Sequence, residues 1–125
     1  MNVKISSTAI ETYGSGGGYA NSGRGGGRIM IQSLQSYVLL NSTAQLLAEG
    51  TQAVSSHFGA GSGGSITVVA RSIYGSGMIS VQGGHSQSIE SGAGGGGRIT
   101  MQVDILSSLS YNMSFQYHIY ISTCN

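Results

Sequence analysis

The residues able to perform acid, base or metal chemistry are few and scattered along the chain. They are four carboxylates and three histidines: Glu11, Glu49, Glu90, Asp104, His57, His85 and His118. Glycoside hydrolysis needs two carboxylates about 5–10 Å apart, and lyase chemistry needs a base with a charge-stabilising partner. When the internal repeats of the chain are aligned, no two carboxylates take equivalent or adjoining positions. We therefore expect no catalytic residue, and the sequence predicts a protein that is not an enzyme.

Metal and cofactor sites are not expected either. Cys124 is the only cysteine, so it has no partner for an intrachain disulfide or a multi-thiolate metal site. Residues 59–64 and 92–97 satisfy the pattern G-x-G-x-x-G, but each run leads into a strand, whereas a dinucleotide-binding loop opens a helix. Lys4 is the only lysine and lies outside these runs, which excludes a phosphate-binding P-loop.

The charge balance argues against nucleic acid and membrane partners. Five basic and four acidic residues give a net charge of +1, and only 7% of residues are charged. Such a balance provides no field that would attract nucleic acid or an anionic membrane. Residues 23–28 (GRGGGR) form a single arginine-glycine element, too short for RNA binding. No stretch approaches the 18 or so apolar residues of a membrane span, and the opening residues lack the apolar core of a signal peptide.

Two triplets match the acceptor pattern for N-linked glycosylation. They begin at Asn41, followed by Ser42 and Thr43, and at Asn112, followed by Met113 and Ser114. In a chain so poor in charge, attached sugar would supply the hydration that charged side chains do not. If the protein is secreted, we therefore expect an N-linked glycan on at least one of Asn41 and Asn112. We expect no other cofactor, and an extracellular or cell-surface location.

The elements that position these residues follow from an internal repeat. Glycine-rich runs lead into β-branched strands at residues 23–32, 61–69 and 94–102. Aligning Ile29, Ile66 and Ile99 gives periods of 37 and 33 residues. We interpret residues 1–125 as one domain with repeats at about 10–45, 46–78 and 79–103, and with 104–125 as a terminal coil or edge strand. The difference in length is expected in the loops 51–58 and 85–91.

Within each period, short segments alternate apolar and polar residues, as in a strand with one buried face. Over one period these segments are residues 66–70, 72–74 and 78–81. No segment has helical spacing. Three short strands in each period of about 35 residues predict an all-β fold, a right-handed parallel β-helix (solenoid) of about three to four coils. The glycines would form its corners, where φ is often positive, and the three aligned isoleucines would stack in its interior.

Three segments also carry a family resemblance: residues 61–66 (GSGGSI), 72–84 (SIYGSGMISVQGG) and 92–99 (GAGGGGRI). They resemble the glycine-rich, pectin-lyase-like right-handed parallel β-helix repeats of large secreted and cell-surface proteins. The resemblance covers roughly residues 10–103, and residues 104–125 depart from it. It implies a shape rather than a reaction.

Two functions remain open. The first is a non-enzymatic structural subunit of an extracellular fibre, filament or surface layer, which joins copies of itself head to tail through exposed strand edges. The residues expected at that assembly edge are Val3, Ile5, Ile10, Phe115, Ile119 and Ile121. The alternative is a carbohydrate-binding or adhesive module of a larger surface protein, with sugar rings packed on Tyr13, Tyr19, Tyr37 and Tyr74.

Overall fold

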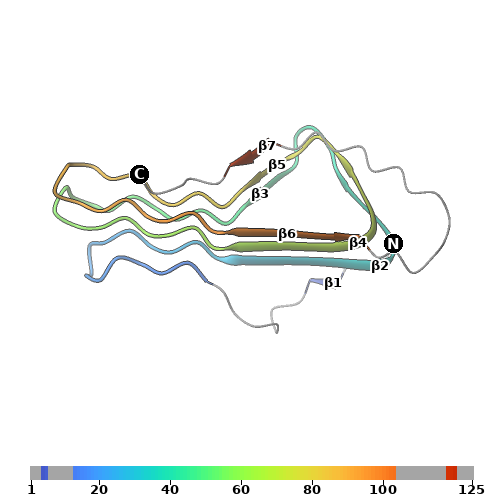
Figure 1. Ribbon diagram of the computed structural model, residues 1–125, viewed down its shortest axis with the longest axis horizontal. Coiled ribbons are helices and arrows are strands. Elements are labelled where there is room, and N and C mark those ends of the chain that lie inside the picture. The colour runs from blue at the N-terminus through green and yellow to red at the C-terminus, as the bar shows by residue number, and fades with distance from the viewer. Residues whose placement is uncertain (1–3, 6–12, 104–117, 121–125) are drawn as a thin grey trace.

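The computed structural model describes residues 4–5, 13–103 and 118–120, and these residues form strands and loops without a helix (Figure 1). The strands are β1 (Lys4–Ile5), β2 (Arg28–Leu40), β3 (Gln45–Leu47), β4 (Ser65–Gly75), β5 (Met78–Ser80), β6 (Arg98–Val103) and β7 (His118–Tyr120). They make two sheets, with strand orders β1-β2-β4-β6 and β3-β5-β7. All neighbouring strands are parallel except β1, which runs antiparallel to β2.

The chain builds these sheets in layers. The first layer holds β2 and β3, the second β4 and β5, and the third β6 and β7. Ile29 pairs with Ile66, which pairs with Ile99, so the predicted alignment of the three isoleucines is confirmed. Alternation along the strands directs them toward the space between the sheets, where Ile66 is fully buried and the other two are half-buried against the same core.

The apolar core is centred on the second layer. Ile66, Val68, Ile73, Ile79 and Val81 have no exposed surface. Each such side chain stabilises the fold by about 1.5–3 kcal/mol relative to an exposed one. In the first layer Val38, Leu40 and Ala48 are also buried, whereas the other apolar residues of the outer layers pack against this core while partly exposed. The second layer is therefore stabilised by its neighbours on both sides.

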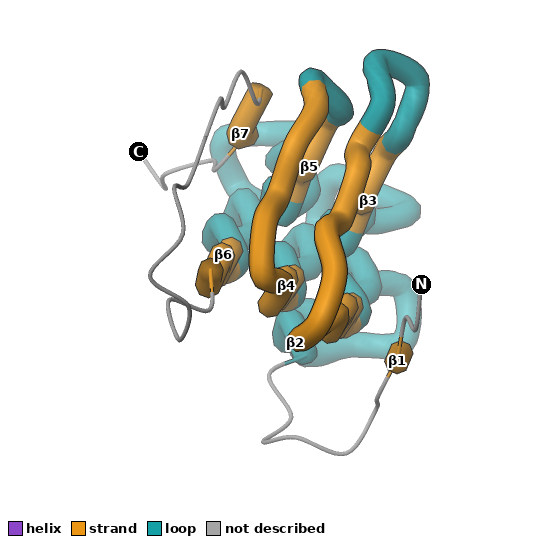
Figure 2. Tube along the Cα trace, turned by 90° about the vertical axis from the view of Figure 1, so that its right-hand side faces the viewer, coloured by secondary structure: helices purple, strands orange, loops and turns teal. Residues whose placement is uncertain are grey.

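The predicted right-handed β-helix of three to four coils is wrong. The described residues form two small parallel sheets that do not close into a solenoid. The strands expected at 66–70 and 72–74 are parts of one continuous strand, β4, which runs through Arg71. Opposite the corner that joins the two sheets, each layer continues into extended glycine-rich runs instead of a further strand (Figure 2).

The variation in repeat length also lies elsewhere than expected. Ser33 pairs with Ala70 and Tyr37 with Ser72, so a bulge in β2 adds two residues. Leu40 pairs with Gly75, whereas Gln45 pairs with Met78, so the corner after β2 is longer than the corner after β4 by two residues. These four residues account for the difference between the periods of 37 and 33, and the loops 51–58 and 85–91 do not contribute.

The glycine-rich runs form a backbone bundle beside the sheets. The runs comprise residues 13–17, 23–27, 48–51, 59–64, 81–84 and 92–97, none of which is in a strand. In the pairing of run 59–64 with run 48–51, the N–H groups of Gly61 and Gly64 donate to the carbonyls of Thr51 and Ala48, at 2.9 and 2.8 Å. The two donors are therefore three residues apart along their run, and so are the two acceptors along theirs.

The same spacing recurs throughout the bundle. It is found in the pairs Gly14→Gly26 and Gly17→Gly23, Gly23→Gly59 and Gly26→Ser62, Ala60→Gly92 and Gly63→Gly95, and Gly94→Gly84 and Gly97→Val81. A β-ladder repeats every two residues, whereas the polyproline II helix has three residues per turn and no internal hydrogen bonds. We conclude that the runs are of polyproline II type and that backbone hydrogen bonds join each run to its neighbours.

This packing explains the glycines. A Cβ added to Gly61, Gly63 or Gly64 would lie 2.0, 1.9 or 1.8 Å from a carbonyl oxygen of a neighbouring run. Among the described glycines only Gly75, at the corner after β4, has a positive φ, of 122°. At Gly61, Gly63 and Gly64 glycine is therefore required for close backbone approach rather than for sharp corners.

We predict that Gly63→Ala lowers the free energy of unfolding by about 1–3 kcal/mol or more, because its Cβ would overlap the Val81 carbonyl. Gly27→Ala is the matched control, since a Cβ there meets nothing within 4 Å and its φ is not positive. The control should be neutral or stabilising by about 0.4–1 kcal/mol. Urea unfolding followed by circular dichroism measures both; equal stability of the two variants would contradict the bundle.

Candidate functional site

The structure describes four acidic and histidine side chains, those of Glu49, Glu90, His57 and His85. Glu49 is exposed and accepts a hydrogen bond from the Ser80 hydroxyl, whereas Glu90 is exposed in the loop 85–91. His57 and His85 are also exposed. Within the described ranges, no three or more His, Cys, Asp and Glu side chains gather as a metal-binding group would require. Glu11, Asp104 and Cys124 lie outside the described residues.

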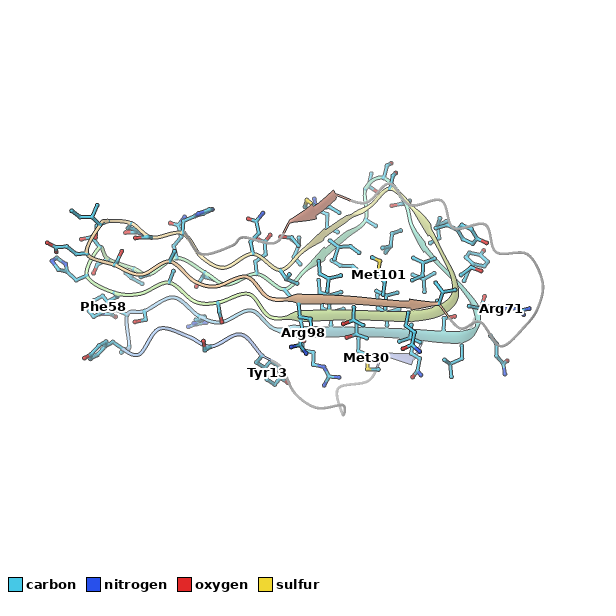
Figure 3. The ribbon with its side chains drawn as sticks, viewed as in Figure 1. Tyr13, Met30, Phe58, Arg71, Arg98 and Met101 are labelled. Atoms are coloured by element: carbon cyan, nitrogen blue, oxygen red, sulfur yellow. The ribbon has the colours of Figure 1, made fainter. Side chains whose placement is uncertain are left out.

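The four tyrosines considered for sugar binding do not form one surface. Tyr37 and Tyr74, on adjacent strands, meet edge to face with ring centroids 6.1 Å apart and planes at 65°. Tyr19 instead packs against Phe58, at 6.1 Å and 52°. Tyr13 is 59% exposed, on the run that precedes the first layer. Phe58, which the sequence did not single out, lies at the far end of the long axis from Arg71 (Figure 3).

Tyr19 and Phe58 belong to a loop tip formed by residues 18–22, 52–58 and 85–91. These loops are cross-linked by hydrogen bonds: Val54 N–H to the Asn21 carbonyl at 3.1 Å, Gln87 Nε2 to the Ala53 carbonyl at 2.9 Å, and the Ser88 hydroxyl to the Ser56 carbonyl at 2.7 Å. The tip nevertheless exposes apolar side chains from all three loops, with Tyr19 76%, Val54 81% and Ile89 fully exposed. The hydrogen-bonded loops of the tip thus expose apolar side chains to solvent.

Of the predicted assembly residues, the structure describes the backbone at two. Ile5 is in β1, at one edge of the first sheet, and Ile119 is in β7, at one edge of the second. Since β1 flanks the first layer and β7 belongs to the third, the two residues lie at opposite ends of the stack. Val3, Ile10, Phe115 and Ile121 lie outside the described residues.

The third layer contains two backbone N–H groups whose equivalents in the second layer donate hydrogen bonds to the next run of the chain. In the register of Ile66 with Ile99, Ala93 and Gly96 are equivalent to Ala60 and Gly63. The N–H groups of Ala60 and Gly63 donate to run 92–97 at 2.9 and 2.8 Å. Those of Ala93 and Gly96 donate to no described residue, and both residues are exposed.

Strand β6 lies at the same end of the stack. Among the described strands it pairs with β4 alone. Its inward side chains Ile99, Met101 and Val103 are half-buried, whereas Ile66, Val68 and Ala70 of β4 are fully buried. Met101 extends into the space between the sheets, on the opposite side of β6 from Arg98 (Figure 3). We call Ala93, Gly96 and β6 the third-layer edge. Its two N–H groups that bond to no described residue could not have been identified from residue types without the geometry of the bundle.

Of the two predicted glycosylation sites, Asn41 is described and is exposed at the corner between β2 and β3. Asn112 lies outside the described residues.

Comparisons with family models, curated proteins and solved structures found no match to this chain. In the described part of the chain, no helix has the length and apolar character needed to cross a membrane.

Proposed function

We propose that this chain is a non-enzymatic structural module that assembles by adding further layers to the third-layer edge, the added layer coming from another copy. The observation that carries the proposal is the pair of N–H donors at Ala93 and Gly96 that bond to no described residue. They repeat the three-residue spacing by which Gly23 and Gly26, then Ala60 and Gly63, bond to the next run. A further polyproline II run would satisfy them in the same way.

The apolar groups of the third-layer edge support the same proposal. A strand added to β6 would cover Ile99, Met101 and Val103 as β6 covers β4, and each side chain so buried contributes up to about 1.5–3 kcal/mol. Several such side chains must be buried, because association costs an estimated 4–15 kcal/mol in translational and rotational freedom. Few charges oppose it: Arg98 is the only charged residue of β6, and run 92–97 has none.

The contact would join unlike surfaces. At the first-layer end, β1 pairs with the edge of β2, and run 13–17 pairs with run 23–27 through Gly14 and Gly17. Because the two ends differ, a contact between them is heterologous and propagates as a filament unless its rotation closes a ring. An extracellular fibre, filament or surface layer is the setting that we propose for such an assembly.

Ala93→Pro tests this proposal. Proline suits the φ of a polyproline II run and removes an N–H that bonds no described residue, so the fold should be retained. The loss of one intermolecular hydrogen bond should weaken assembly by about 0.5–1.5 kcal/mol, or about 2- to 12-fold in association constant. Sedimentation velocity over a concentration series, with negative-stain microscopy, measures the effect.

Ala60→Pro is the matched control, because it removes an N–H that bonds Gly92 within the chain and should lower the stability of the monomer. Assembly of Ala93→Pro equal to that of the parent would contradict the mechanism, as would a parent that stays monomeric at high concentration.

The loop tip favours a second candidate, the carbohydrate-binding module. Tyr19 and Phe58 provide aromatic surface at the end of the molecule, next to hydroxyl and amide groups of the cross-linked loops. Sugar recognition commonly combines an apolar ring face with a few fixed polar groups. Tyr37 and Tyr74 form a similar ring pair, at 65°, but they lie on adjacent strands and not among the cross-linked loops.

We predict that Tyr19→Ala lowers retention on neutral polysaccharide in affinity electrophoresis by about 2- to 12-fold in association constant, equivalent to about 0.5–1.5 kcal/mol for a lost ring contact. Tyr37→Ala, which removes an equally large ring far from the tip, should bind as the parent does. The sugar-binding candidate is wrong if the parent is not retained, or if both variants lose binding equally.

A further inference from the structure

The corner between β2 and β3 is longer than the equivalent corner of the next layer. Residues 41–44 fill this corner, whereas Ser76 and Gly77 alone fill the equivalent corner between β4 and β5. The shorter corner is bonded to the first layer, since the Ser76 and Gly77 N–H groups both donate to the Leu40 carbonyl, at 2.9 and 3.0 Å. The longer corner, turquoise in Figure 1, stands out beyond it at the apex of the two sheets.

The two additional residues do not serve the core. Asn41, Ser42 and Thr43 are all exposed, and Ala44 is the one residue of the corner that packs against the apolar cluster. The corner is closed by the Ala44 N–H, which donates to the Asn41 carbonyl at 3.0 Å. The insertion thus displays a short polar segment on a fixed turn.

That segment is the acceptor triplet, and it is already ordered. The Asn41 Oδ1 accepts hydrogen bonds from the Thr43 N–H at 3.2 Å and from the Thr43 hydroxyl at 3.0 Å. The residue two positions after the asparagine must carry a hydroxyl in this pattern, and here that hydroxyl contacts the acceptor amide. Both contacts are made through Oδ1, and no described residue accepts a hydrogen bond from Nδ2.

We propose that Asn41 is a site of N-linked glycosylation. The donor class is an oligosaccharide joined through its anomeric carbon to a polyprenyl diphosphate. A bond forms between Asn41 Nδ2 and the anomeric carbon, the bond from that carbon to the diphosphate oxygen breaks, and the lipid diphosphate leaves. One Nδ2 proton passes to a base of the transferase, so no oxidant or reductant is required.

The position of Asn41 is compatible with the assembly proposed above but does not depend on it. The residue follows β2, which is two strands away from β6, roughly 10 Å at the usual strand spacing. A glycan there would extend from the apex between the sheets. It would hydrate the side of the stack while leaving the third-layer edge free for another copy.

The experiment is secretion of the full chain from a eukaryotic cell, followed by peptide mass spectrometry before and after treatment with peptide N-glycosidase. We expect a glycan on the peptide that contains Asn41 and conversion of that residue to aspartate by the enzyme. Asn41→Gln and Thr43→Ala should both abolish this signal, whereas Ser42→Ala and Thr43→Ser should keep it. Asn112→Gln, which removes the other triplet, should leave it unchanged.

An unmodified Asn41 in secreted, folded parent protein would overturn the proposal. So would sugar on this peptide that persists in Asn41→Gln, since it would then be attached to a hydroxyl. Circular dichroism of each variant checks that the fold is kept. The readout is a covalent mass at one residue, so its outcome is separate from the outcome of the sedimentation experiments.

Discussion

The close approach of glycine-rich backbones is the constraint on which the rest of this structure depends. Run 59–64 exchanges hydrogen bonds with five other runs, 13–17, 23–27, 48–51, 81–84 and 92–97. Its buried glycines Gly61, Gly63 and Gly64 leave no room for a Cβ. The bundle pairs the backbone groups of segments that belong to no sheet, mainly with other backbone groups; the Arg24 N–H, which donates to the Thr51 hydroxyl, is an exception. A single methyl group in its centre would therefore separate the layers.

The sheets and the bundle stabilise one another. The sheets bury a small apolar core centred on the second layer, with Ile66, Ile73 and Ile79 fully enclosed. The bundle fixes the entry of β4 and β6, since the Ser65 and Arg98 N–H groups donate to the Gly27 and Gly64 carbonyls at 3.0 and 2.9 Å. Pairing parallel strands brings together residues more than 30 positions apart, which costs entropy because the intervening loops must be ordered. The hydrogen bonds at the starts of β4 and β6 offset part of this cost.

The layered construction assigns different properties to three parts of the surface. The third-layer edge has half-buried apolar side chains and backbone donors that bond to no described residue. The loop tip has exposed aromatic and aliphatic groups, and the apex between the sheets has an exposed polar segment at 41–43. The edge lies where the described repeat stops and the apex where one layer departs from the next, whereas the loop tip is built by loops of successive layers. Assembly, recognition and modification could therefore be combined in one chain without competing for the same residues.

The sequence by itself determined the repeat, because strand alternation and the isoleucine spacing depend on local periodicity, and Ile29, Ile66 and Ile99 are indeed in register. It also located the triplet at Asn41. It did not determine what the glycines do, because a glycine required by a positive φ and one required by a nearby carbonyl look the same in a sequence. Only the tertiary structure decided that Gly75 is of the first kind and Gly63 of the second. The pairing of Tyr19 with Phe58 was likewise decided in three dimensions, as were the N–H groups of Ala93 and Gly96 that bond to no described residue, because both depend on which distant segments the bundle brings into contact.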